Sequence, residues 1–269
     1  SNYYDTAVEG FGKESGGIEF TSDVVWGLQL DAINDDLFNK EGKIKEKRER
    51  RSDSCKTKYP LVMVHGLGFR DLHYFNYWGR IPAALEKNGA KLYYGSQQSA
   101  DSVENCAGEL KAKIDEIVEK TGCEKVNIIA HSKGGLDSRY AVAMLGADVK
   151  VASLTTINTP HRGCQFADYL LSKAPAGFKD AVAGKYNAAL KKLGDKDPDF
   201  IAAVTDLTAS ACEKLNEVCK DSPNVYYQSV GSRSVNAMGG KFPMNLSYLL
   251  VKYFDGPNDG LVSVDSMKW

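Results

Sequence analysis

The sequence of 269 residues contains no apolar run of the roughly 18 residues that a membrane span needs. It also has no excess of charge of one sign, because 34 lysines and arginines face 35 aspartates and glutamates. Without a net basic charge the chain has no overall field for the phosphates of nucleic acid, so we expect no nucleic-acid partner. Residues 1–5 lack the basic start and apolar stretch of a secretory signal. The protein is therefore either intracellular or has lost a signal.

The cysteines include no CxxC pair, which argues against a zinc ribbon and against a thioredoxin-like redox site. The six cysteines are Cys55, Cys106, Cys123, Cys164, Cys212 and Cys219. Cys212 and Cys219 fall on one face of a predicted helix but about two turns apart, too far to bridge each other. We expect buried free thiols, with one or two disulfides as the alternative.

The first 58 residues show weak periodicity and then a charged run at 40–51, where glutamates interleave with more numerous lysines and arginines. Such a run is typical of a solvated helix or linker, with a docking site for an acidic partner as the alternative. We expect residues 1–58 to be an N-terminal extension that packs on, or leads into, a larger domain at 59–269.

From Tyr59 onward, short apolar runs alternate with amphipathic stretches, which is typical of an α/β fold with a mostly parallel, doubly wound sheet. Strands are predicted at 61–64, 91–95, 126–130, 151–157 and 224–230, and helices at 82–88, 102–121 and 134–145. Asp101 and Glu104 have the spacing of a capping box for the long helix. Residues 161–221 have helical periodicity throughout, so we expect a helical cap inserted on the sheet.

A serine lies in a tight turn between a predicted strand and a predicted helix. Ser132 is flanked two residues away by Ala130 and Gly134, small residues that such a turn needs because it brings neighbouring backbone close. This is the pattern of a nucleophile elbow, although Ala130 replaces the usual first glycine. The amides at the start of the following helix would favour a developing oxyanion. The sequence therefore predicts Ser132 as a nucleophile.

The first strand of the larger domain ends in His65-Gly66-Leu67-Gly68. An oxyanion hole needs two backbone amides at the carboxyl edge of the sheet, one of them from the residue after the nucleophile. Lys133 supplies that amide, and Leu67 is our candidate for the second, because glycines on both sides let the loop carry its N–H toward the substrate. We expect His65 to order this loop by hydrogen bonding, with proton transfer as the alternative.

Four motifs in the larger domain together resemble a known family. They are Val62-Met63-Val64-His65-Gly66-Leu67-Gly68, Ala130-His131-Ser132-Lys133-Gly134-Gly135, Asn158-Thr159-Pro160-His161-Arg162-Gly163 and Gly256-Pro257-Asn258-Asp259-Gly260-Leu261-Val262. Their order resembles that of bacterial triacylglycerol lipases of the α/β-hydrolase superfamily, and the similarity is closest to clostridial and bacillar members. The resemblance covers about 59–269 and implies a serine carboxylic ester hydrolase, most simply a triacylglycerol lipase, with a helical cap at about 161–221 over the acyl pocket.

The resemblance also implies roles for particular residues. Ser132 would be the nucleophile, the amides of Leu67 and Lys133 would bind the oxyanion, and Asp259 would be the acid of the triad, with Asp255 as the alternative. No organic cofactor is implied. The chain is too short between Gly95 and Asn127 for the zinc-binding insertion of thermophilic bacillar members, so zinc is not expected. Calcium, which pseudomonad-type relatives bind near the triad, stays undecided.

Partners and location follow from the same resemblance. It implies an ester or lipid substrate, with transient contact at a lipid–water interface, and a monomer. It implies secretion after removal of a signal, and a cytoplasmic protein is the alternative.

The expected general base is missing from its place. Family members carry a histidine after the triad acid, and no histidine follows Asp259. The four histidines are His65, His73, His131 and His161. A serine without a base is a weak nucleophile at neutral pH. We expect the catalytic histidine some tens of residues beyond Trp269, and the alternatives are an inactive fragment or use of His161 or His73 as the base.

Two rival functions stay open. The same fold hosts many acyl transfers, so a thioesterase, amidase or peptidase is the alternative within the enzyme class. A non-catalytic binding protein that keeps the scaffold as a ligand pocket is the alternative from another class. The missing histidine favours that protein, whereas the intact elbow argues against it.

Overall fold

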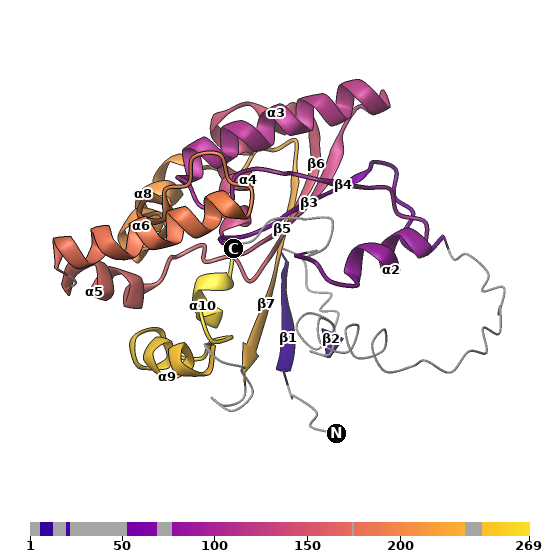
Figure 1. The fold of residues 1–269 in the computed structure, drawn as a ribbon. Helices are drawn as coiled ribbons and strands as arrows, with labels where there is room; N and C mark the ends of the chain where they lie inside the picture. The colour runs from indigo at the N-terminus through magenta and orange to yellow at the C-terminus, as the bar shows by residue number, and fades with distance from the viewer. Residues whose placement is uncertain (1–5, 13–19, 22–52, 69–76, 174, 235–243) are drawn as a thin grey trace, which may run out of the picture.

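The computed structural model describes residues 6–12, 20–21, 53–68, 77–173, 175–234 and 244–269. Within these residues the strands form one seven-stranded sheet with helices around it (Figure 1). In sheet order the strands are β2 (Phe20–Thr21), β1 (Thr6–Gly12), β7 (Tyr226–Ser234), β6 (Val151–Ile157), β5 (Val126–His131), β3 (Leu61–Val64) and β4 (Leu92–Tyr94). Five strands run parallel to one another, namely β7, β6, β5, β3 and β4. Strand β1 pairs antiparallel with both β7 and β2.

The order of the parallel strands reverses at β3. The next strand in sequence, β4, lies on one side of β3, and β5 lies on the other. In open α/β sheets a ligand crevice forms at such a reversal, outside the carboxyl ends of the strands. The loop after β3 and the turn after β5 therefore meet where the fold makes a site.

The core lies between the parallel strands and two helices, α3 (Val103–Thr121) and α4 (Lys133–Met144). Leu110 and Ile114 of α3 are fully buried in one cluster with Val62 of β3 and Ile128 of β5. Each such side chain contributes about 1.5–3 kcal/mol through its removal from water. The apolar residues from which these strands and α3 were predicted therefore also pack the sheet against its helices.

The cap of α3 differs from the sequence prediction. Ser102, not Asp101, is the N-cap, and its hydroxyl accepts a hydrogen bond from the amide of Asn105. Asp101 instead accepts hydrogen bonds from the amide of Ser102 and the side-chain amide of Asn105. The capping box with Glu104 was therefore a wrong prediction by one residue, because serine and aspartate are both good N-caps and stand side by side here.

The helical periodicity between 161 and 221 corresponds to four helices, α5 (Gln165–Lys173), α6 (Ala176–Lys192), α7 (Phe200–Thr205) and α8 (Ala209–Val218). In Figure 1, α5, α6 and α8 gather at one side of the molecule, beside the sheet. We call these four helices and the loops that join them the cap. The loop from α6 to α7 returns to the residues that follow β4, through hydrogen bonds described below.

Several elements lie where the sequence analysis assigned none. They are β1 and β2, the 3₁₀ turn Ala147–Val149, α9 (Met244–Asp255) and α10 (Val264–Met267). By contrast, α2 (Ile81–Lys87) carries Pro82 in its first turn and ends before Gly89, which has a φ of 94°. That helix matches its sequence prediction.

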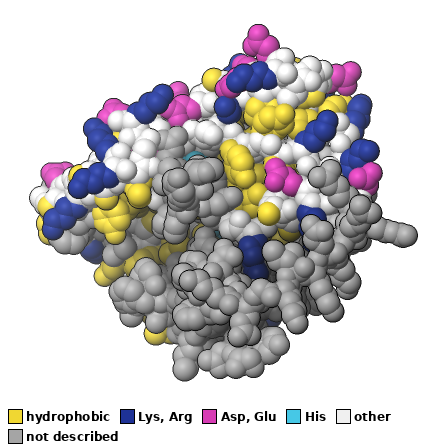
Figure 2. Space-filling model, turned by 45° about the vertical axis from the view of Figure 1, so that its right-hand side comes forward, with side chains coloured by type: hydrophobic (Ala, Val, Ile, Leu, Met, Phe, Trp, Pro, Cys, Tyr) yellow, Lys and Arg dark blue, Asp and Glu magenta, His cyan; other side chains and the backbone are white. Residues whose placement is uncertain are grey.

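The charged run at 40–51 and His73 lie outside the described residues. No helix of the described part of the chain is long and apolar enough to cross a membrane. All six cysteines are free thiols, and Cys106, Cys212 and Cys219 are buried. On the face drawn in Figure 2, side chains of both charges are interspersed, as the balanced composition predicts.

Candidate active site

The turn after β5 holds Ser132 in a strained backbone conformation. Its φ of 53° and ψ of −131° are rare for a residue with a side chain, and such a conformation costs about 1–3 kcal/mol. Three hydrogen bonds hold it. The Ser132 amide donates to the carbonyl of Ile157 at 2.9 Å, and the Ser132 carbonyl accepts from the Gly135 amide at 3.0 Å and the Thr159 hydroxyl at 2.9 Å. Strand β6, the loop that follows it and the first turn of α4 therefore stabilise the elbow.

Three glycines let the surrounding backbone approach this turn. A Cβ on Gly66 would lie 2.8 Å from Ser132 Cβ, and a Cβ on Gly134 would lie 2.3 Å from the carbonyl oxygen of His65. A Cβ on Gly135 would lie 2.1 Å from Thr159 Oγ1. Distances this short are excluded for real side chains. The small residues around Ser132 thus place the loop after β3 directly against the elbow.

The Ser132 hydroxyl is half-buried and has no hydrogen-bond partner among the described residues. The backbone amides of Leu67 and Lys133 likewise donate to no acceptor in the described part of the chain. Lys133 begins α4, where the first amides of a helix have no intrahelical acceptor. An available hydroxyl and two available amides therefore belong to residues at one sheet edge.

The loop after β3 is tied down on its buried side. The imidazole of His65, which is 1% exposed, lies 3.0 Å from the carbonyl of Gly66 and 3.1 Å from the carbonyl of Gln97. The Gln97 side-chain amide donates back to the carbonyl of His65 at 3.0 Å. Gly68, with a φ of 85°, donates its amide to the carbonyl of Ser99 at 3.0 Å. His65 is therefore occupied in holding the loop.

The residue before the nucleophile is held by an aromatic side chain that the sequence analysis did not identify. The Tyr77 hydroxyl forms a short hydrogen bond with His131 Nδ1, and Tyr77 also packs against the rings of His65 and Trp78. Burial lowers the pKa of His131 to about 4. The ring is therefore neutral at physiological pH.

Lys133 carries a second feature besides its amide. Its Nζ lies 2.7 Å from Asp137 Oδ1, one turn further along α4, and both side chains are almost wholly buried. Burial opposes the charge on Lys133, but Asp137 and the Cys106 thiol more than offset it and raise the lysine pKa. Burial also raises the pKa of Asp137 to about 6, although Lys133 counteracts the effect. The i,i+4 spacing in the sequence was a signal for this pair, and it was missed.

Asp259 lies in the turn that follows α9. The amide of Ser234, the last residue of β7, donates to the carbonyl of Asn258, which brings this turn to the sheet edge that also carries Ser132. Asp259 Oδ1 accepts hydrogen bonds from the amides of Leu261 and Val262 at 2.9 and 2.8 Å. Asp259 Oδ2 has no hydrogen-bond partner in the described ranges. Burial raises the Asp259 pKa to about 6, although the backbone amides lower it.

Asp255 has a different environment from Asp259. Its Oδ1 accepts from the amide of Gln165 at 3.2 Å, and its Oδ2 accepts from the amide of Phe166 at 3.4 Å. Cys164 Sγ also contacts Oδ2, at 3.6 Å. Both oxygens of Asp255 are thus used to cap α5, where a carboxylate is favoured by the helix dipole.

His161 is buried on the inner side of the loop after β6. Its Nε2 lies 2.9 Å from the Thr156 hydroxyl, and its Nδ1 lies 3.3 Å from the Arg139 guanidinium. Trp269 packs against the ring. Because a guanidinium only donates, Nδ1 accepts, and the proton of a neutral ring is on Nε2. Burial and the charges of Arg139 and Arg162 lower the His161 pKa well below its ordinary value. Both ring nitrogens are therefore engaged away from Ser132.

No group of three histidine, cysteine, aspartate or glutamate side chains in the described ranges is arranged to hold a metal ion. Calcium binding therefore stays undecided, as in the sequence analysis.

Comparison with known proteins identifies the family of the chain. The palmitoyl protein thioesterase family matches residues 60–226, a stretch that includes both Leu67 and Ser132. A triacylglycerol lipase of Vibrio cholerae serotype O1 is 32% identical over 232 residues, which are 78% of this chain and 74% of that protein. The chain belongs to the lipase and esterase family of the α/β-hydrolases. That membership was predicted from the four motifs.

Two further relatives describe the extent of the similarity. A triacylglycerol lipase of Pseudarthrobacter phenanthrenivorans is 36% identical over 172 residues, 60% of this chain and 53% of that lipase. This α/β-hydrolase therefore spans about half the length of that relative. The crystal structure of Bacillus licheniformis lipase BlEst2 in mature form superposes with a TM-score of 0.59 at 25% identity, covering 78% of this chain and 79% of that one. The predicted fold class is confirmed.

Proposed function

We propose that this protein is a carboxylic ester hydrolase, and specifically a triacylglycerol lipase, that acts through a serine acyl-enzyme. One observation supports the proposal most directly. The hydroxyl of the strained Ser132 and the amides of Leu67 and Lys133 have no hydrogen-bond partner among the described residues, at the crevice where the strand order reverses. A tetrahedral intermediate needs such a nucleophile beside two oriented N–H donors.

In this proposal Ser132 Oγ attacks the ester carbonyl, and the oxyanion accepts hydrogen bonds from the amides of Leu67 and Lys133. The base takes the Ser132 proton and passes it to the alcohol, which leaves as its bond to the acyl carbon breaks, and water then releases the acid from the acyl-enzyme. The two amides are fixed before the substrate binds, because Gly68 and Ser132 are themselves hydrogen-bonded to neighbouring loops and strands. Fixed dipoles of this kind need no reorganisation during the reaction.

Asp259 is the proposed acid of the triad, rather than Asp255. Two backbone amides orient the Asp259 carboxylate through Oδ1 and leave Oδ2 to accept from a histidine N–H. Both carboxylate oxygens of Asp255 instead accept hydrogen bonds from the first two amides of α5. A triad acid must hold the imidazole in the correct tautomer, which needs a free, oriented oxygen.

The base is a histidine other than the three described ones, since His65, His131 and His161 are each held by other partners. Two sources remain for it, His73 and a histidine beyond Trp269. His73→Ala tests the first source, because turnover that depends on Ser132 should be lost in this variant if His73 is the base and kept if it is not.

A thioesterase is the second candidate, because the matching family is described by that activity. The experiment that decides compares p-nitrophenyl esters, triacylglycerols and acyl thioesters of the same acyl chain, with Ser132→Ala as the blank. Ester turnover that depends on Ser132 supports the proposal. Preference for the thioester selects the second candidate, and turnover that survives in Ser132→Ala refutes both.

A further inference from the structure

One short segment, residues 97–103, lies between the cap and the loop that carries Leu67. On the side of that loop it is bonded through three contacts. Gln97 exchanges hydrogen bonds with His65, through its carbonyl at 3.1 Å and its side-chain amide at 3.0 Å. The Ser99 carbonyl accepts from the amide of Gly68 at 3.0 Å. Gly68 directly follows Leu67, so Ser99 holds the residue next to the proposed oxyanion donor.

The same segment is bonded to the cap on its other side. The carboxylate of Asp195, in the loop between α6 and α7, accepts from the Ser99 amide at 3.0 Å and the Ser99 hydroxyl at 2.7 Å. The amide of Asp197 donates to Gln98 Oε1 at 2.6 Å, and the amide of Asp199 donates to the carbonyl of Ala100 at 2.7 Å.

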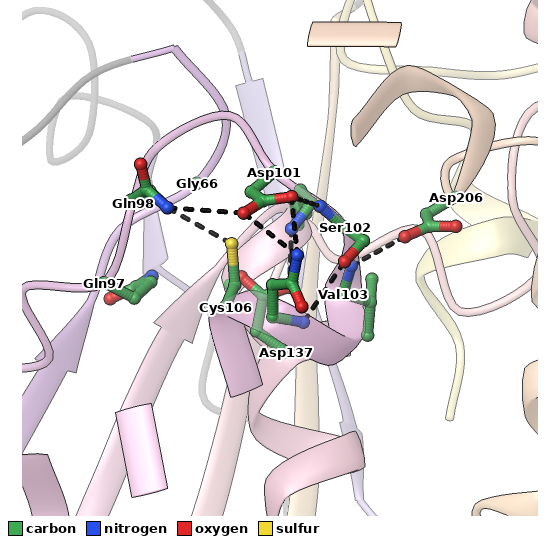
Figure 3. Close-up of polar contacts among 12 residues, drawn as sticks. Gly66, Gln97, Gln98, Asp101, Ser102, Val103, Cys106, Asp137 and Asp206 are labelled. Carbon is green, nitrogen blue, oxygen red and sulfur yellow. Dashed lines mark hydrogen bonds and ion pairs between the residues drawn. The ribbon is translucent and has the colours of Figure 1, made fainter. Parts of the chain in front are cut away.

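A further cap residue completes the attachment. Asp206 Oδ2 accepts from the amide of Val103 at 2.6 Å, and Figure 3 shows Asp206 reaching Val103 from a separate part of the chain. In the same view Gln98 and Cys106 point toward each other, as the Cys106 thiol donates to the Gln98 carbonyl at 3.4 Å. The segment is thus bonded to the loop at Gln97 and Ser99 and to the cap at four of its residues, and Ser99 is bonded on both sides.

Apolar packing joins the same three parts. Leu67 and Phe200 pack on a small buried cluster of Ala100, Leu190 and Ala203. Leu190 belongs to α6, and Phe200 and Ala203 belong to α7. The side chain of the proposed oxyanion donor therefore rests on cap residues, in addition to the hydrogen bonds through Ser99.

We propose that Asp195 is a positioning residue for the oxyanion hole, acting through Ser99 to hold the Leu67–Gly68 backbone in place from the cap. Asp195 is 4% exposed, and each of its two carboxylate oxygens accepts a hydrogen bond from Ser99, so this contact between cap and segment has a charged acceptor and two donors. The proposal rests on the proposed function of the Leu67 amide. Its consequence is that the cap acts on the rate of acyl transfer as well as on substrate choice.

The test uses Asp195→Ala and a matched control in the same loop. Asp197 contacts the segment only through its backbone amide, and its carboxylate is 92% exposed, so Asp197→Asn leaves the attachment intact. A misplaced oxyanion donor lowers kcat by about 10- to 100-fold, with KM within about threefold. We expect that loss in Asp195→Ala and wild-type kcat in Asp197→Asn. Ser99→Ala keeps the amide bond to Asp195 and should fall between them.

A second readout does not depend on turnover. Hydrogen exchange of the amide of Gly68 should become at least about tenfold faster in Asp195→Ala, and unchanged in Asp197→Asn, because only the first variant frees Ser99. If Asp195→Ala does not fold, Ser99→Ala carries the same two measurements. Wild-type kcat or unchanged exchange in the folded variant overturns the inference. Loss of the proposed function is a separate result, seen as wild-type protein that hydrolyses no acyl ester while the exchange result stands.

Discussion

Lys133 Nζ lies 2.7 Å from Asp137 Oδ1 in a part of the protein where the two side chains are only 2% and 3% exposed. A lysine at the start of a helix is disfavoured by the helix dipole, and the desolvation of a buried ion pair can exceed its attraction. The pair therefore stands at a position where charge is costly, directly after the proposed nucleophile. Neither charge can be removed alone without leaving the other buried.

Asp137→Asn should destabilise the protein by about 3–5 kcal/mol at pH 8, because it leaves the Lys133 cation buried without a counter-ion. Urea unfolding followed by circular dichroism measures the change. The matched control is Asp115→Asn, which removes the partner of both Lys111 and Lys150 at a site where all three side chains are more than a third exposed to solvent. That control should cost about 1 kcal/mol or less. Equal losses in the two variants would contradict the buried pair.

Gly66→Ala should lower kcat by about 10- to 100-fold, because its Cβ would lie 2.8 Å from both Ser132 Cβ and the Tyr77 hydroxyl. The added methyl group must push the loop after β3 away from the elbow. Steady-state kinetics with a p-nitrophenyl ester measures the loss. Gly108→Ala in α3 is the control, since nothing lies within 4 Å of the new Cβ, and it should add about 0.5–1 kcal/mol of stability with unchanged kcat. A Gly66→Ala enzyme of normal rate would show that the contact is not tight.

His131 should stay neutral down to about pH 4, because burial lowers the pKa of its ring to that value. Between pH 6.5 and 4 the unfolded chain then binds the proton and the folded chain does not, so stability from this residue is lost as the pH falls. NMR titration of the His131 ring carbon signals tests this prediction. A midpoint near 6.5 in the native protein would contradict the buried environment.

Tyr77→Phe removes the hydrogen-bond partner of His131 Nδ1 and should lower the free energy of unfolding by about 1–3 kcal/mol.

The strands of the core could be predicted from the sequence because their own residues decide them. β3, β5 and β6 are apolar runs that are buried by helices, and their ends shift from the prediction by one residue at most. β1 has the sequence TAVEGFG, with two glycines and a glutamate, and it is a strand because it pairs with β7, more than 200 positions away along the chain. A partner at that distance leaves no local pattern to detect.

The same distinction applies to the site. Ser132, Lys133 and Leu67 could be proposed from the sequence because the turn and loop chemistry around them is local, and Gly66 and Gly134 belong to those motifs. The proposed role of Asp195 has no such local signal, because its partner Ser99 lies 96 positions away. Asp259 and Asp255 could not be separated by motif alone. They differ in what their oxygens contact, which depends on the packing of α5 against α9.

Asp259→Asn should lower kcat by about 10⁴-fold, the loss expected when a triad acid can no longer fix the histidine tautomer. In the native protein kcat/KM should fall as the pH drops through about 6, because burial raises the pKa of Asp259 to that value and only the ionised carboxylate orients the base.

The Asp259→Asn change should affect the stability of the fold in the opposite direction from its effect on activity. A carboxyl whose folded pKa is raised destabilises the folded state above that pKa, so the neutral asparagine should leave the melting temperature at pH 8 unchanged or higher. Asparagine Oδ1 can still accept from the amides of Leu261 and Val262.

Asp255→Ala is the matched control. It should keep a near-native kcat and lower the free energy of unfolding by about 1 kcal/mol, because α5 loses its capping carboxylate. If Asp255→Ala instead lost activity and Asp259→Asn kept it, Asp255 would be the acid of the triad.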